Sequence, residues 1–185
     1  MSLPRFSRTH FSVMTCVTLT AALMCGCIGE NEEKLREIAV GSPLPTFSVT
    51  MNDGTTINST DLSDCVTVLT FFHTSCPDCR KELPELQKAY DHYSSAAENN
   101  NEPEVKFISI ARAESEEQIY EYWTAQGLTL PYSPQSDRSI YSLFASSIIP
   151  RIYIVSTDRK IAFAFSDKNM PTADKIIAAI ESCRK

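Results

Sequence analysis

One stretch of the chain, residues 66–83, decides the fold: VTVLTFFHTSCPDCRKEL. Its first seven residues carry no charge and are mostly β-branched or aromatic, which predicts a strand buried on both faces. Cys76 and Cys79 follow closely, and Pro77 stands at the expected first position of a helix, where a missing N–H is tolerated. The stretch therefore predicts a strand that delivers a Cys-x-x-Cys pair to the N-terminus of a helix.

This placement of two cysteines is typical of a dithiol–disulfide redox centre. The thiolate, not the thiol, attacks a disulfide, and a helix N-terminus favours the anion. We expect Cys76 to be the nucleophile and Cys79, one helical turn later, to be the resolving thiol. A structural disulfide or a zinc site is the alternative, but zinc needs four ligands and the chain has no second Cys-x-x-Cys. We expect neither a metal nor a cofactor.

The rest of the chain alternates strands and helices around this stretch. In order, we expect a hairpin (45–58), the strand 66–72, a helix (77–94) containing Pro84, a strand (105–110), a helix (115–126), an irregular segment (128–136), a short helix (137–145), a hairpin (151–165) and a last helix from Pro171. A strand-helix-strand unit with a right-handed crossover makes its strands parallel. The late hairpin would then add two strands to one mixed sheet, which predicts an α/β sandwich.

The first 26 residues have the pattern of an export signal. A basic start with Arg5 and Arg8 precedes an apolar run, residues 11–24, that is too short for a comfortable membrane span. The end of this run, Gly26-Cys27, resembles a bacterial lipobox, which implies cleavage after Gly26 and a lipid on Cys27. An ordinary secretory signal or a single hydrophobic anchor are the alternatives. We expect a signal peptide (1–26), a polar tether (27–37) and one domain (38–185).

The charge balance excludes one large class of partner. Cleavage would remove Arg5 and Arg8, leaving 15 basic and 23 acidic side chains and a net charge of −8. Such a chain has no general attraction for phosphate backbones, and no basic stripe is present, so we expect no nucleic-acid binding.

Two cysteines, Cys65 and Cys183, remain beside Cys27 and the Cys-x-x-Cys pair, and in an oxidising compartment they suggest a bridge if the fold brings them together.

From about Ile38 to its end, the chain resembles the TlpA/ResA type of thioredoxin-fold thiol-disulfide oxidoreductase. The resemblance rests on a combination of features: the N-terminal hairpin, the block 70–84, an inserted helix before Ile149-Pro150 and the hairpin after it. It implies a thioredoxin fold, exchange with protein cysteines, an upstream redox partner and a lipid-anchored place in the bacterial cell envelope, facing the periplasm or the surface. In this fold the last helix returns to the end of the sheet where Cys65 lies, which favours a Cys65–Cys183 bridge.

The resemblance also assigns roles to three further residues. Glu82 matches a family glutamate three residues after the second cysteine, which implies a partly buried carboxyl that exchanges a proton with Cys79. Its spacing alone favours a surface glutamate beside two basic residues. Pro150 matches the family's cis-proline, and Ile149 before it would offer backbone hydrogen bonds to the substrate chain.

Several positions depart from the family pattern. Ser75 stands where a tryptophan is common, and Thr70 where thioredoxin has a buried acid. Asp78 adds negative charge beside the sulfurs, which disfavours a thiolate and weakens the oxidising power of the disulfide. We therefore predict a reductant or a mild exchanger. Arg151 would either add positive charge near the sulfurs or point to solvent.

Two other functions remain open at this stage. A thioredoxin-fold peroxidase would need a threonine three residues before the reactive cysteine and a proline upstream, where this chain has His73 and no proline. A non-catalytic copper or other metal-binding protein would use His73 with Cys76 and Cys79. We expect His73 to be an ordinary strand-end residue.

Overall fold

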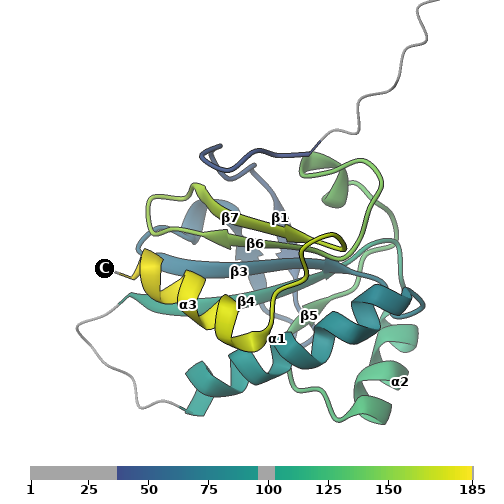
Figure 1. Ribbon diagram of the computed structural model, residues 1–185. Helices are drawn as coiled ribbons and strands as arrows, with labels where there is room; N and C mark the ends of the chain where they lie inside the picture. Colours follow the sequence, from purple (N-terminus) through teal and green to yellow (C-terminus); the bar gives the residue numbers. More distant parts are fainter. Residues whose placement is uncertain (1–36, 96–102, 185) are drawn as a thin grey trace, which may run out of the picture. The chain divides into compact units, whose positions relative to one another are not determined.

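A five-stranded mixed sheet lies at the centre of the fold (Figure 1). The structure is a computed structural model that describes residues 37–95 and 103–184. The strands lie in the order β5 (Tyr132–Ser133), β4 (Glu104–Ala111), β3 (Cys65–Phe72), β6 (Arg151–Val155) and β7 (Ile161–Ser166). The first three are parallel to one another, whereas β6 is antiparallel to both β3 and β7. The predicted α/β class with a mixed sheet is confirmed.

Helices cover the sheet, and a small hairpin supports one edge. The helix α1 (Pro77–Ser95) packs against α3 (Ala173–Cys183), and α3 contacts β3 and β6. In Figure 1 the two helices lie side by side in front of the sheet, while α2 (Glu116–Gln126) lies at the lower right, below one end of α1. The hairpin of β1 (Ser48–Thr50) and β2 (Thr56–Asn58) is tied to β5, because Ser133 Oγ donates to Thr50 O at 2.6 Å. The antiparallel pairing of β1 with β2 confirms the predicted hairpin around Gly54.

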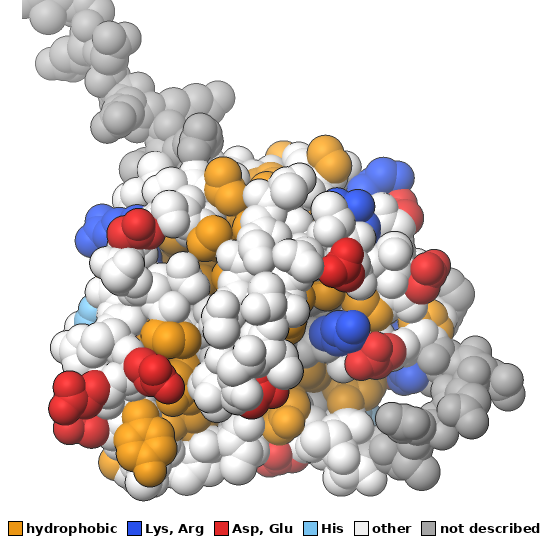
Figure 2. All heavy atoms as spheres, turned by 180° about the vertical axis from the view of Figure 1, so that it is seen from behind, with side chains coloured by type: hydrophobic (Ala, Val, Ile, Leu, Met, Phe, Trp, Pro, Cys, Tyr) orange, Lys and Arg blue, Asp and Glu red, His pale blue; other side chains and the backbone are white. Residues whose placement is uncertain are grey.

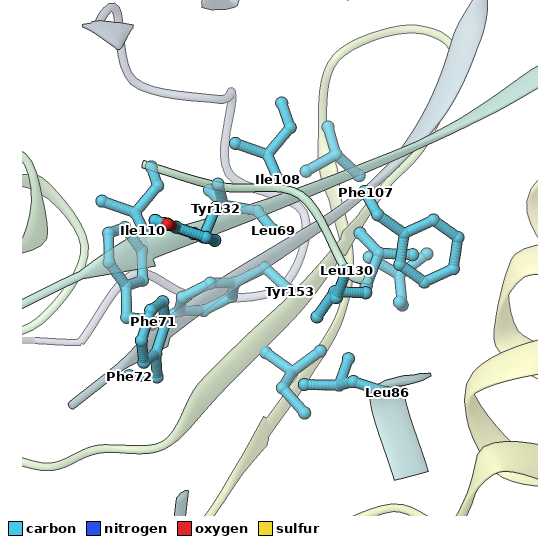
Figure 3. Close-up of a cluster of buried hydrophobic side chains, with 14 of the residues drawn as sticks. Leu69, Phe71, Phe72, Leu86, Phe107, Ile108, Ile110, Leu130, Tyr132 and Tyr153 are labelled. Atoms are coloured by element: carbon cyan, nitrogen blue, oxygen red, sulfur yellow. The ribbon is translucent and has the colours of Figure 1, made fainter. Parts of the chain in front are cut away.

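The strand β3 is buried along its whole length, as its lack of charge predicts. Neighbouring side chains of a strand point to opposite faces. Phe71 therefore packs against Tyr141 and Phe144, with ring centroids 5.5 and 4.9 Å away. Phe72 faces Trp123 at 4.9 Å on the other side. Figure 3 shows Phe71 and Phe72 among other buried side chains of the core. The end of β3, which the cysteines follow, is therefore packed on both faces.

Three local expectations are corrected. Within residues 137–145 the structure has a single 3₁₀ turn, η2 (Tyr141–Leu143), in place of the predicted short helix. Asp137 Oδ1 accepts from Ser139 N and so forms a local turn instead of capping a helix. The 3₁₀ turn places Tyr141 and Phe144 on one side, against Phe71. The segment 128–136 contains the short strand β5, whose place at the edge of the sheet tolerates nearby prolines. The last helix begins at Ala173, after its N-cap Thr172, instead of at Pro171.

Some predictions concern residues that the structure does not describe. The predicted signal peptide (1–26), Cys27 with its predicted lipid and nearly all of the predicted tether lie outside the described residues. No helix in the described ranges has the length and the apolar character to cross a bilayer. On the face of the described part that Figure 2 shows, acidic and basic side chains are interspersed and form no continuous basic band.

The capping box of α2 provides a first test of the fold. Ser115 Oγ accepts from Gln118 N at 3.4 Å, and Gln118 Oε1 accepts from Ser115 N at 3.3 Å. We expect Ser115→Ala to lower the free energy of unfolding by about 1 kcal/mol, because backbone donors at the helix start lose a partner. Ser115→Asp keeps an acceptor and should retain most of the stability. Urea unfolding measures both, and equal stability of Ser115→Ala and the wild type would contradict the role of the cap.

Candidate active site

The two cysteines sit where β3 passes into α1. Cys76 N donates to His73 O at 3.0 Å and Arg80 N donates to Cys76 O at 3.1 Å, so the turn leads directly into the first turn of the helix. Both cysteines are free thiols, but their exposure differs. Cys76 is half-buried, whereas Cys79 is fully buried at 0% exposure. Only Cys76 is therefore placed to meet a large partner.

The loop before β6 faces the accessible thiol. The Ile149–Pro150 peptide bond is cis, as the resemblance implied. Cys76 Sγ lies 3.7 Å from Ile149 O, so a carbonyl from the far side of the sequence points at the sulfur. Both Ile149 and Pro150 are buried. The predicted nucleophile and the predicted substrate-binding residues are thus brought together.

Glu82 lies inside the protein. Its side chain is only 2% exposed, and its Oε1 has no hydrogen-bond partner within the described residues. Burial, aided by the charge of Glu85, raises the pKa of Glu82 to about 7. Glu82 follows Cys79 by three residues, and both belong to the buried face of α1. The reading of Glu82 as a surface glutamate is wrong, because this carboxyl with a raised pKa is buried one helical turn from Cys79.

Cys79 is held as a neutral thiol. Burial raises the pKa of Cys79 far above its ordinary value, an effect that a backbone hydrogen bond with His73 partly opposes. A thiol of this kind must lose its proton to a base before it can attack a disulfide.

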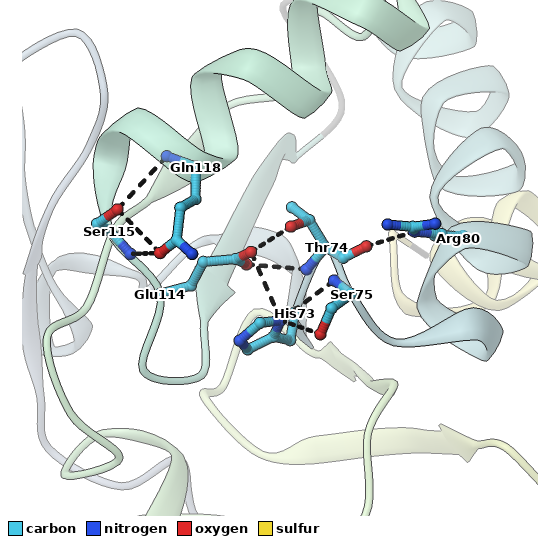
Figure 4. Close-up of polar contacts among 7 residues, drawn as sticks. All are labelled: His73, Thr74, Ser75, Arg80, Glu114, Ser115 and Gln118. Atoms are coloured by element: carbon cyan, nitrogen blue, oxygen red, sulfur yellow. Dashed lines mark hydrogen bonds and ion pairs between the residues drawn. The ribbon is translucent and has the colours of Figure 1, made fainter.

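Sequence reasoning missed a second buried acid, Glu114, beside the segment that precedes Cys76 (Figure 4). Glu114 is 3% exposed, and its Oε2 accepts from Thr74 N at 2.8 Å while its Oε1 accepts from the Thr74 hydroxyl. Arg80 Nε donates to Thr74 O at 2.5 Å. Thr74 is therefore fixed through its amide, its carbonyl and its side chain. The available signal was position, because Glu114 follows β4, the parallel neighbour of β3.

His73 is tied to its own loop. Its Nδ1 lies 2.9 Å from Ser75 Oγ and 3.5 Å from Glu114 Oε1. Because one ring nitrogen faces both groups, the three side chains do not form a Ser-His-Glu relay, which needs both nitrogens. Among the described residues, no three His, Cys, Asp or Glu side chains are grouped so that they could hold a metal ion.

Charges near the sulfurs differ from expectation in two places. Asp78 forms an exposed ion pair with Lys81, whose Nζ lies 2.8 Å from Asp78 Oδ1, so its charge beside Cys76 is partly compensated. Arg151 does not point to solvent. Its side chain is 7% exposed, donates to Ile148 O at 3.1 Å and pairs with Glu37. The expectation of a solvent-facing Arg151 is wrong, because its side chain is buried against Ile148 O and pairs with the Glu37 carboxylate.

Cys65 and Cys183 are free thiols in the structure, without the expected bridge. The end of α3 does lie where β3 begins, since Arg184 Nε donates to Pro103 O and the next residue, Glu104, pairs with Cys65. Cys65, however, is buried and its Sγ donates inward to Leu62 O at 3.4 Å. We expect alkylation of denatured, unreduced protein with an oxidised Cys76–Cys79 pair to label both Cys65 and Cys183. Labelling of neither would show that the bridge forms.

A Cys-x-x-Cys pair at the start of α1, a cis-proline facing it and a sheet of this order together define a thiol-disulfide oxidoreductase of the thioredoxin fold. A family model described as the AhpC/TSA family matches residues 40–164. The chain therefore belongs to the AhpC/TSA family.

Individual proteins of similar sequence or structure carry related names. The chain is 24% identical over 124 residues to the thiol-disulfide oxidoreductase ResA of Bacillus subtilis (strain 168), a match that covers 67% of this chain and 65% of that protein. A thiol:disulfide interchange protein of the thioredoxin family from Chlorobium tepidum TLS has a similar structure, with a TM-score of 0.62 at 20% identity, covering 79% of this chain and 98% of the other. StoA from Bacillus subtilis is similar with a TM-score of 0.60 at 22% identity, covering 75% and 98%. The two structures confirm the thioredoxin fold.

Proposed function

We propose that this protein is exported and exchanges disulfides with protein cysteines through Cys76 and Cys79. The observation that carries the proposal is the arrangement of the two thiols. Cys76 is accessible at the helix start and faces Ile149 O, while Cys79 is buried behind it. Such an asymmetric pair suits a reaction in which one sulfur meets the partner and the other ends the encounter.

The reaction has two steps in the reducing direction. The Cys76 thiolate attacks one sulfur of the substrate disulfide, so that a mixed disulfide forms, the substrate S–S bond breaks and the released substrate thiolate takes a proton from solvent. Cys79 then gives its proton to the Glu82 carboxylate and attacks the Cys76 sulfur. The second substrate cysteine leaves as a thiolate and is protonated. The substrate is reduced, and the Cys76–Cys79 disulfide must be reduced again by an upstream dithiol partner.

The environment of Cys79 favours a reductant or mild exchanger. A disulfide oxidises strongly when the reduced form is stabilised as a thiolate, as in strong oxidants of this kind. Here burial disfavours the Cys79 thiolate. Glu82, three residues later on the same buried helix face, would add to this effect when it is ionised. The compensation of Asp78 by Lys81 acts in the opposite sense but lies at the surface, where its effect is smaller.

Ile149 would bind the substrate chain through its backbone, beside Pro150.

The export part of the proposal rests on the signal pattern before Cys27. Cys27 would carry the lipid that holds the domain in the cell envelope. Expression in a bacterial host followed by membrane fractionation tests it. We expect the wild type in the membrane fraction and Cys27→Ser in the soluble periplasmic fraction, and identical distributions would refute lipid attachment.

One assay set separates the proposed function from its competitors. We expect the protein to accelerate reduction of insulin by dithiothreitol, to consume peroxide no faster than a Cys76→Ser control and to bind copper no better than Cys79→Ser. Insulin reduction at the uncatalysed rate, combined with rapid peroxide consumption, would favour a peroxidase. Tight stoichiometric copper binding without insulin reduction would favour a metal-binding protein.

A further inference from the structure

The geometry points to three side chains, Arg112, Tyr141 and Arg151, as positioning residues that hold the loop 147–150 ready for the substrate chain. We call them the loop clamp. They come from three separate places: Arg112 directly follows β4, Tyr141 begins η2 and Arg151 begins β6. The inference rests on the proposed function, because it assigns a role in binding the polypeptide substrate.

Three successive carbonyl groups of the loop, those of residues 147–149, each have a defined partner. Arg112 Nη1 donates to Ser147 O at 2.6 Å. Ile148 O accepts twice, from Tyr141 OH at 2.8 Å and from Arg151 Nε at 3.1 Å. The next carbonyl, Ile149 O, faces Cys76 Sγ at 3.7 Å. The clamp therefore occupies the two carbonyls before the one that faces the nucleophile, and it fixes the direction of that one.

Arg151 is the member of the clamp whose charged group is buried and bonded to two partners. Its guanidinium is almost fully buried, and such a group is stable inside a protein only when it is paired and hydrogen-bonded. Its fork meets two partners at once, with Nε on Ile148 O and Nη1 on Glu37 Oε1. Lysine cannot reproduce this planar pair of donors. The arrangement ties the loop to Glu37, at the entry to the domain.

The other two members support each other and the same loop. The Arg112 guanidinium lies over the Tyr141 ring, 5.3 Å from its centroid. Tyr141 is buried and packs against Phe71 through its ring, so its hydroxyl is delivered to Ile148 O from a rigid base. Glu37 is held in turn, because its neighbour Ile38 donates from N to Phe144 O at 2.7 Å.

A preorganised loop spares a peptide substrate the ordering of that loop on binding. A small disulfide that touches only the sulfur gains nothing from it. Weakening the clamp should therefore raise KM for a polypeptide disulfide, by roughly tenfold for Arg151→Lys, and leave kcat within about twofold. The rate of attack on a small disulfide should stay unchanged.

The test uses the full-length protein with two probes, insulin and 5,5′-dithiobis(2-nitrobenzoic acid). Arg151→Lys removes the fork, and Tyr141→Phe removes one hydroxyl while it keeps the ring packing, so the second variant serves if the first folds poorly. Arg138→Lys, an exposed arginine on the neighbouring segment, is the matched control. We expect a raised KM for insulin in the two clamp variants alone, with equal rates for the small disulfide in all proteins.

Two results would overturn the inference. One is an unchanged KM for insulin in both clamp variants, and the other is a parallel fall of both rates, which marks a general loss of structure. A wild type that reduces neither probe would instead overturn the proposed function, and the inference with it.

Discussion

Replacing Cys76 with serine will reduce disulfide exchange to the background rate, whereas Cys79→Ser will arrest the reaction at a mixed disulfide. The first variant lacks the accessible nucleophile, and the buried Cys79 thiol cannot replace it, because burial both hides Cys79 and raises its pKa. The second variant keeps the attacking sulfur but loses the thiol that releases the partner. Mass spectrometry of the Cys79→Ser protein after incubation with a disulfide-containing polypeptide should find the partner attached to Cys76.

A third variant controls for general effects of losing a thiol. Cys183→Ser alters a half-buried cysteine at the end of α3, far along the chain from the site, and should keep the wild-type rate. Adducts on Cys79 in the Cys76→Ser protein would reverse the assigned roles. A Cys79→Ser protein that turns over at the wild-type rate would remove the resolving step from the mechanism.

The second large effect concerns the pH dependence of stability. Burial raises the pKa of Glu82 to about 7 from its ordinary value of 4.5. The folded protein therefore binds more protons than the unfolded chain between these values, so the free energy of unfolding falls as pH rises from about 4.5 to about 7. The fall from this group amounts to about 3 kcal/mol at most. Glu82→Gln has no proton to lose, so it should be the more stable protein above pH 7, by an amount up to this order.

Urea unfolding of the reduced proteins across this pH range measures the effect. Glu121→Gln, on the exposed side of α2, is the matched control and should follow the wild-type curve. Parallel curves for Glu82→Gln and the wild type would show that Glu82 is already ionised at low pH. That result would also remove Glu82 as the base that receives the Cys79 proton near neutral pH.

Much of the fold could be predicted because its signals are local. The charge-free run of β3, Pro77 at the start of α1 and the turn at Gly54 each act within a few residues, and the structure has all three elements. The Cys76–Cys79 spacing, with Pro77 between the two, likewise predicts Cys76 directly before a helix and Cys79 in its first turn, as the structure has them. The proximity of the Ile149–Pro150 loop to Cys76 came from the family resemblance, since no local pattern specifies a contact across 73 positions.

The missed features depend on contacts that only the folded chain creates. Glu114 and Thr74 meet because β4 and β3 are parallel neighbours. A single glutamate after a predicted strand does not indicate such a contact. Arg151 is buried because Glu37 and Ile148 O surround it, whereas its charge suggested solvent or the sulfurs. The burial of Glu82 was implied by the family resemblance and not by spacing, because a glutamate three residues after a cysteine suits a surface as well as a core.

The account depends on a reversible disulfide between Cys76 and Cys79, and a redox titration tests it directly. The protein is equilibrated in thiol–disulfide buffers between about −320 and about −100 mV, alkylated, digested and analysed by mass spectrometry. The account predicts a single two-electron transition confined to the Cys76–Cys79 peptide, with a midpoint below about −150 mV. Cys76 and Cys79 both remaining alkylatable at every potential would contradict it.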